Sequence, residues 1–465
     1  MLTNDPGNLT ITAKERNTTA TTVSDGFEQS NLASPEANKI AQAFLASTAA
    51  QETQTAVTEI PVLSNKEYKR LYENAFYCRE VSDYSGSAAA WGAIADTLHP
   101  SAFLARCQQI RDLMLEGGEA NKQKVQELIS QLATELETFK EQGREFEVHP
   151  GQPAMPLSAA IVSEKLDVVA LELKENHPEA ALLIWEAVAE NNVLRATPYG
   201  AVACYEMGSQ YEKEKQYAKA AEKYSQVPVE QSVTYKNKQG EIVENKIGAR
   251  CAYNAAWAYF KTENWQAAAE AFMSIPPQAN LMRGEDEVVA ACCMARMLNQ
   301  KEAVPANGIS WAKAVELFQK NNNLDKIKGD GEYLIDYARS LAGLSAENDP
   351  AATARVAELR DAALDVYLSI AEQDPRVHLA VQARIAAAEL FLQKEDYRAG
   401  MLELRRAIEH CDQTEGRDGE IVDAEKVKLE RALALKRLEE ICNDPNAGEV
   451  AGVAKRLLQR YQNAP

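Results

Sequence analysis

Two stretches of the chain decide its fold: residues 201–228, AVACYEMGSQYEKEKQYAKAAEKYSQVP, and residues 249–276, ARCAYNAAWAYFKTENWQAAAEAFMSIP. Both place small and large apolar residues at successive gaps of 3, 9, 4 and 3 residues. The matching positions are Gly208, Tyr211, Ala220, Tyr224 and Val227 in the first stretch and Ala256, Tyr259, Ala268, Phe272 and Ile275 in the second. A gap of three is about one helical turn and the gap of nine crosses a turn between helices, so each stretch predicts a pair of antiparallel helices.

The same spacing returns elsewhere in the chain. The further copies are Ala388, Phe391, Gly400, Leu404 and Ala407, and more loosely Ala75, Cys78, Ser87, Trp91 and Ile94. An aromatic residue precedes the small residue of each second helix by three positions, at Tyr84, Tyr217, Trp265 and Tyr397. Small residues allow two helices to approach closely, and large ones fill the space between neighbouring pairs. We therefore expect the large residues of the pattern, such as Tyr211 and Tyr259, to lie in the core.

This spacing resembles the tetratricopeptide repeat, a helix-turn-helix unit of about 34 residues. The resemblance implies an all-α, right-handed superhelical solenoid whose first helices line a concave groove that receives a peptide or a partner helix. The two best copies start at residues 201 and 249, farther apart than regular repeats. We expect an inserted loop or hairpin at 228–246, where two β-prone runs flank a glycine-containing turn. The predicted solenoid is therefore irregular.

A second resemblance covers one segment near 151–173. Pro156-Leu-Ser-Ala-Ala-Ile followed by Leu166-Asp-Val-Val-Ala-Leu-Glu-Leu resembles an ankyrin unit, with Ser158 at the place of the usual histidine. A single ankyrin unit cannot bury its faces alone. We interpret the segment as a variant helical hairpin within the same array and keep the ankyrin unit as the alternative.

The chain is expected to have three parts. Residues 1–60 are rich in Thr, Asn, Ser, Ala and Gln, which predicts a disordered polar tail. Residues 61–150 are expected to form N-terminal helical hairpins, and 151–465 the solenoid, which ends in capping helices at about 419–442 and 449–462.

Charge and hydropathy limit the partners. The 50 Lys and Arg against 69 Asp and Glu leave a formal charge of −19, which repels nucleic acid and favours basic or neutral protein segments. Apolar runs such as Ala180 to Trp185 are too short to insert in a membrane. The polar amino terminus and the scattered cysteines indicate a cytoplasmic protein. The alternative is delivery outside the cell by a signal-peptide-independent system, because the tail also resembles the export signals of bacterial type III effectors.

Motifs for catalysis are not found. The sequence has no phosphate-binding glycine loop, no GxSxG and no HExxH, and its five histidines never stand at i and i+4. We therefore predict no catalytic residues, no metal site and no cofactor. The alternative is an enzyme or secreted effector whose site lies in the less regular segments 101–200 or 286–345.

The groove that the resemblance implies supplies the candidate binding residues: Tyr205, Arg250, Tyr253, Asn254 and Trp257. Basic and Asn residues on the first helices can hold a terminal carboxylate, and Arg250 with Asn254 makes half of such a clamp. The aromatic residues are candidates for contacts with a ligand, with packing against the neighbouring repeat as their other role. The sequence thus predicts a non-catalytic scaffold, adaptor or chaperone for protein segments, with self-association as a further possibility.

Overall fold

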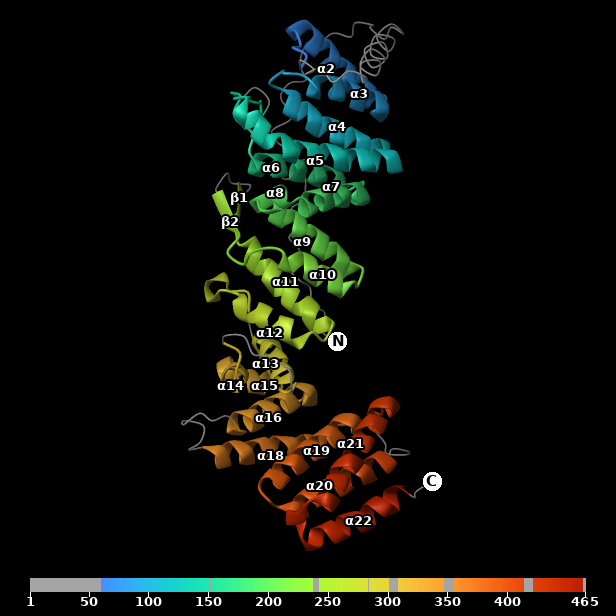
Figure 1. The fold of residues 1–465 in the computed structure, drawn as a ribbon, viewed down its shortest axis with the longest axis vertical. Coiled ribbons are helices and arrows are strands. Elements are labelled where there is room, and N and C mark those ends of the chain that lie inside the picture. Colours follow the sequence, from blue (N-terminus) through green and yellow to red (C-terminus); the bar gives the residue numbers. More distant parts are fainter. Residues whose placement is uncertain are drawn as a thin grey trace. The chain divides into compact units, whose positions relative to one another are not determined.

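The computed structural model describes residues 60–462 except 150–152, 237–241, 283, 301–307, 347–354 and 414–420 (Figure 1). The described residues are mostly helical with one small hairpin, so the predicted all-α class is confirmed. None of the described helices combines the length and apolar character that a membrane span requires. Residues 1–59 of the predicted tail lie outside the described residues. Contacts divide the chain into two compact units between Cys251 and Ala252, whereas the sequence suggested a boundary at 150/151.

Unit 1 is built from helices that contact their near neighbours along the chain. Its helices are α2 (Asn65–Glu80), α3 (Tyr84–Ala95), α4 (Ala102–Glu116), α5 (Glu119–Glu141), α6 (Ala159–Lys174), α7 (Pro178–Glu190), α8 (Asn192–Arg195), α9 (Pro198–Lys213) and α10 (Tyr217–Ser225). Successive helices such as α2 and α3, or α9 and α10, pack together, and α4 also contacts α6 while α7 contacts α9. Ser64, Ser158 and Thr197 cap helix starts by accepting backbone N–H groups.

The segment between α10 and α11 (Ile247–Lys261) contains a β-hairpin. Strands β1 (Val233–Lys236) and β2 (Ile242–Asn245) pair in antiparallel register, with Val233 opposite Asn245. The two strands coincide with the β-prone runs of the sequence. Helix α11 carries the boundary between the two units.

Unit 2 follows the same packing pattern. Its further helices are α12 (Trp265–Ser274), α13 (Glu285–Leu298), α14 (Trp311–Gln319), α15 (Asn323–Lys326), α16 (Gly331–Ala346), α18 (Val356–Gln373), α19 (Val377–Gln393), α20 (Tyr397–Asp412), α21 (Ala424–Asn443) and α22 (Glu449–Gln462), with short 3-10 turns at η3 (Pro277–Ala279), η4 (Lys320–Asn322) and η5 (Pro445–Ala447). Each successive pair from α18 to α22 packs together, and α13 contacts both α14 and α16. Local contacts therefore dominate each unit.

Four hairpins that share the sequence spacing also share one turn. Two residues after the first helix of each ends, a non-glycine residue has φ between 59° and 61°: Ser82, Lys215, Glu263 and Glu395. In each turn the next N–H donates to the carbonyl five residues earlier, on Cys78, Tyr211, Tyr259 and Phe391, at 2.7–3.0 Å. This is the Schellman ending of a helix, which usually places glycine at the left-handed position. The repeated spacing therefore corresponds to a repeated backbone geometry.

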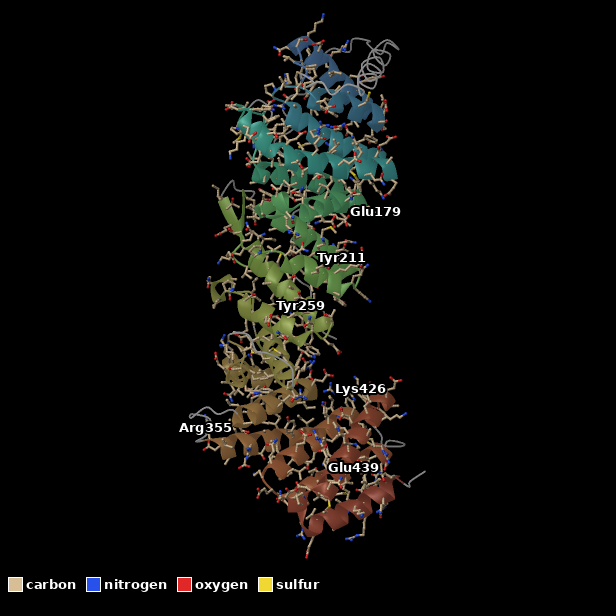
Figure 2. The ribbon with its side chains drawn as sticks, in the orientation of Figure 1. Glu179, Tyr211, Tyr259, Arg355, Lys426 and Glu439 are labelled. Carbon is tan, nitrogen blue, oxygen red and sulfur yellow. The ribbon has the colours of Figure 1, made fainter. Side chains whose placement is uncertain are left out.

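The small and large residues of the pattern meet inside the hairpins. A Cβ on Gly208 would lie 2.6 Å from the ring of Tyr224, so the two helices touch only because residue 208 has no side chain. Tyr224 and Phe272 are buried as expected. Tyr211 and Tyr259 are instead half-buried (both are labelled in Figure 2). Both stand in the last turn of a first helix, where the hairpin ends and the second helix covers less of the side chain.

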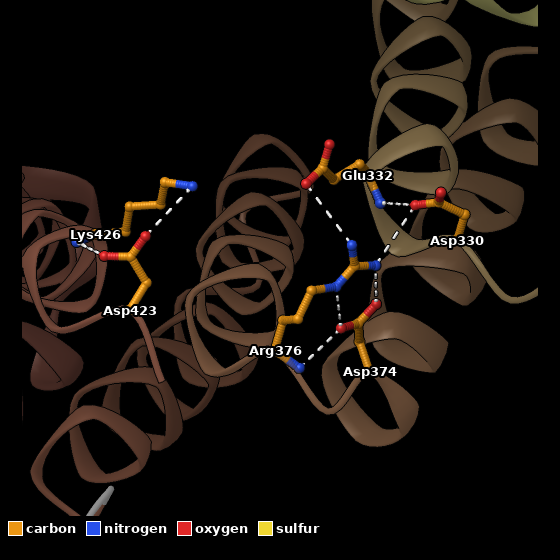
Figure 3. Close-up of polar contacts among 6 residues, drawn as sticks. All are labelled: Asp330, Glu332, Asp374, Arg376, Asp423 and Lys426. Carbon is orange, nitrogen blue, oxygen red and sulfur yellow. Dashed lines mark hydrogen bonds and ion pairs between the residues drawn. The ribbon is translucent and has the colours of Figure 1, made fainter. Parts of the chain in front are cut away.

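An ion cluster ties the start of α16 to the turn between α18 and α19 (Figure 3). The Arg376 guanidinium donates to both oxygens of Asp374, at 3.0 and 2.9 Å, and lies 3.5 Å from Asp330 and 3.7 Å from Glu332. Burial alone would raise the pKa of Asp374, but the hydrogen bonds and charge of Arg376 outweigh it and lower that pKa.

Candidate functional site

The structure assigns the five predicted groove residues to two helices. Tyr205 lies on α9, and Arg250, Tyr253, Asn254 and Trp257 lie on α11. The unit boundary leaves Tyr205 and Arg250 in unit 1 and the other three residues in unit 2. All five side chains are half-buried.

In unit 1, Tyr205 has a packing role. Its ring centroid lies 5.9 Å from that of the buried Tyr224, with the rings tilted by 53°. The Arg250 guanidinium makes no ion pair with any residue that the structure describes. Arg250 is half-buried, and Tyr205 packs within its own hairpin.

In unit 2, Tyr253 and Trp257 converge on Asp286 in the first turn of α13. The Tyr253 hydroxyl donates to Asp286 Oδ1 at 2.8 Å, and Trp257 Nε1 donates to the same oxygen at 3.3 Å. Burial, the hydrogen bond to Asp286 and its negative charge together raise the pKa of Tyr253. The two bonds fix both rings relative to α13.

A line of aromatic side chains continues from this point. Trp257 makes an edge contact with Phe260 at 5.7 Å between centroids, and Phe260 makes another with Trp265 at 5.6 Å. We call Tyr253, Trp257, Phe260 and Trp265 the aromatic row. All four side chains are half-buried, and the Arg296 guanidinium lies 4.6 Å from the Trp265 ring centroid. The row joins helix α11, the start of α12 and helix α13.

A buried carboxylate holds Arg296 in place. Arg296 Nε donates to Asp336 Oδ2 at 2.7 Å, and Arg339 binds the other oxygen of the same carboxylate. Burial raises the pKa of Asp336, although both guanidinium charges oppose the shift. Burial disfavours the charge of Arg296, yet Asp336 raises the pKa of Arg296 overall. Asp336 thus holds the Arg296 cation in a fixed position against Trp265, at one end of the aromatic row.

Sequence reasoning found part of this site. It selected Tyr253 and Trp257 from their phase on the first helix of a repeat, but it did not select Asp286, Phe260 or Arg296. Asp286 and Arg296 lie on α13, which follows the repeat and has no place in the repeat pattern. Only the three-dimensional contact between α13 and α12 brings them to the row.

The chemistry of the row suits binding. It offers aromatic faces, one fixed cation and one carboxylate that accepts two hydrogen bonds. Across the described parts of the chain, no group of three His, Cys, Asp or Glu residues is arranged to hold a metal ion. The eight cysteines are free thiols, and seven of them are buried.

Comparison with known proteins adds no relative: no protein-family model and no curated protein matches the chain.

Proposed function

We propose that the protein is a non-catalytic scaffold, adaptor or chaperone that binds a segment of a partner protein on an irregular tetratricopeptide-like solenoid. The observation that carries the proposal is the half-buried aromatic row with Arg296 at its edge. Support for the repeat architecture comes from the identical turns at Ser82, Lys215, Glu263 and Glu395. Repeat proteins stack helical hairpins of one kind into extended surfaces.

The composition of the row is typical of the energetic centre of a protein interface. Trp, Tyr and Arg are the residues most enriched at such centres, where their large rigid side chains exclude water. Asp286 and Asp336 already hold Tyr253, Trp257 and Arg296, so little side-chain freedom remains to be lost on binding.

Charge selects the class of partner. The formal charge of −19 and the carboxylate of Asp286 beside the row favour a segment that is basic or neutral. An apolar or aromatic partner residue would lie against the rings, and a lysine or arginine of the partner would lie near Asp286. The partner that we propose is therefore a protein or peptide segment.

A peptide-display selection on the full chain tests this proposal. We expect basic or neutral peptides to be selected. Trp265→Ala should weaken their binding at least tenfold, which is about the effect of truncating one residue at the energetic centre of an interface. Tyr217→Ala is the matched control, because Tyr217 starts the second helix of another copy at the position that Trp265 occupies. It should leave binding unchanged.

Circular dichroism and light scattering complete the design. Both variants must keep the helicity of the parent chain, and light scattering separates peptide binding from self-association. Equal losses in the two variants, or selection of acidic peptides, would contradict the assignment of the row as the binding surface.

A further inference from the structure

Unit 1 contains a pocket of about 300 Å³. Its walls come from the segment after α3, from α4 and α5, and from the chain that follows α5. Its floor consists of buried apolar side chains: Phe103, Leu132, Phe139, Phe146 and Leu157. Two arginines, Arg106 and Arg144, line it together with two carboxylates, Asp96 and Glu135, two threonines and two glutamines. The pocket thus combines an apolar floor with a lining that is half polar, and its volume lies at the small end of small-molecule sites.

Arg144 is the unusual member of this lining. Its guanidinium lies 4.8 Å from the ring centroids of both Phe139 and Phe146, which are 5.1 Å apart. Its Nη2 donates to the carbonyl oxygen of Thr97 at 3.1 Å. No carboxylate of the described chain forms an ion pair with it. The cation is therefore held in one orientation by rings and a carbonyl while most of its donors remain without an anion.

The other charged groups of the pocket already have partners. Arg106 binds Asp96 and the side chain of Gln109, so this cation is neutralised locally. Glu135 accepts a hydrogen bond from Gln131 at 2.7 Å rather than pairing with Arg144. Burial lowers the pKa of Arg144, and the charge of Glu135 opposes that shift. Of the two arginines that line the pocket, Arg144 is the one that forms no ion pair with a described residue.

We propose that this pocket binds a monocarboxylate with a compact apolar body. The carboxylate would accept two N–H bonds from the planar guanidinium of Arg144, a geometry that arginine provides and lysine does not. The apolar body would lie on Phe103, Leu132 and Leu157. Asp96 and Glu135 on the same lining disfavour a doubly charged phosphate, and the small volume excludes large ligands. The carboxylate can belong to a free small acid or to the end of a peptide.

Isothermal titration of the full chain tests the proposal with four probes. The free acid 2-naphthoate is compared with neutral 2-naphthamide, and N-acetylphenylalanine is compared with its amide as a mimic of a peptide end. We expect at least one acid to bind about tenfold or more tightly than its amide, since a hydrogen bond to a charged group has at least that effect. The preferred acid assigns the source of the carboxylate.

Two variants of Arg144 and one control locate the interaction. Arg144→Gln should abolish the preference for the acid, and Arg144→Lys should weaken acid binding several-fold because it retains the charge without the planar fork. Arg355→Gln, which changes an exposed arginine just before the start of α18 (labelled in Figure 2), should have no effect. If Arg144→Gln loses helicity, the test rests on Arg144→Lys, whose acid binding should be several-fold weaker than that of the parent chain. Absence of binding for both acids, equal binding of the amides, or an unchanged preference in the Arg144 variants would each overturn the proposal.

Discussion

Replacing Gly208 by alanine tests whether close helix approach holds the hairpins together. The added Cβ would lie 2.6, 2.7 and 2.8 Å from three ring atoms of Tyr224, where carbon atoms normally stay about 3.5 Å apart or more. Tyr224 is fully buried, and its hydroxyl donates to Glu212 at 3.1 Å, so the ring has little freedom to retreat. Such overpacking costs about 1–3 kcal/mol.

A second effect of the same substitution has the opposite sign. Alanine favours a helix interior by about 1 kcal/mol over glycine. Because the clash involves a fully buried ring, we place the packing cost in the upper half of its range. Gly208→Ala should therefore lower the free energy of opening this hairpin by about 1–2 kcal/mol.

A double-mutant cycle makes the prediction specific. Tyr224→Leu alone removes the ring and should cost about 2 kcal/mol or more. Combined with Gly208→Ala it recreates the pair Ala388 and Leu404, which occupies the same pattern positions in another copy, with both side chains fully buried. The double variant loses the packing cost but keeps the helix propensity of alanine, so it should be about 2–3 kcal/mol more stable than the sum of the single effects predicts.

Hydrogen exchange of peptides from α9 and α10 is the assay, because it reports the opening of this hairpin even when the two units unfold separately. The reasoning would be refuted if the free-energy changes of the two single variants sum to that of the double variant within about 0.5 kcal/mol. A neutral Gly208→Ala variant would refute it as well.

Three further predictions concern the turns and the buried charges. Glu263→Gly should raise the thermal midpoint, because glycine removes the backbone strain at φ 59°. The control Glu270→Gly, within α12, should lower stability by about 1 kcal/mol. A lower midpoint for Glu263→Gly than for Glu270→Gly would show that residue 263 is not strained. Asp336→Ala should cost about 3–5 kcal/mol in urea unfolding, since it leaves two partly buried arginines without their carboxylate; a loss no larger than that of an exposed ion pair would show that the cluster is not stabilising. Asp374→Asn should be less stable than the parent at pH 7, because Arg376 lowers the folded-state pKa of Asp374. That stabilisation is complete above the unfolded pKa of about 3.9 and is lost as the pH falls through the folded-state value, so melts at decreasing pH should converge.

The local spacing carried much of the information about the hairpins. Helix periodicity, the small residues and the aromatic that starts each second helix predicted helix pairs at α9 and α10, α11 and α12, and α19 and α20. The sequence did not predict the left-handed turns, because lysine and glutamate, the residue types at 215, 263 and 395, do not favour that conformation. Their geometry is imposed by the packing of the two helices that they join.

The sequence by itself determined that the chain is helical and that four hairpins share one pattern, because both properties depend on residues within about 30 positions of one another. Only the tertiary structure decided which side chains of other elements reach those hairpins. Asp286 reaches Tyr253 and Trp257, and Arg296 reaches Trp265, through the packing of α13 on α12. Arg144 lies against two phenylalanine rings and reaches the Thr97 carbonyl because the segment after α5 folds back beside that helix. Such contacts depend on how separate elements meet in space, and no local spacing encodes that.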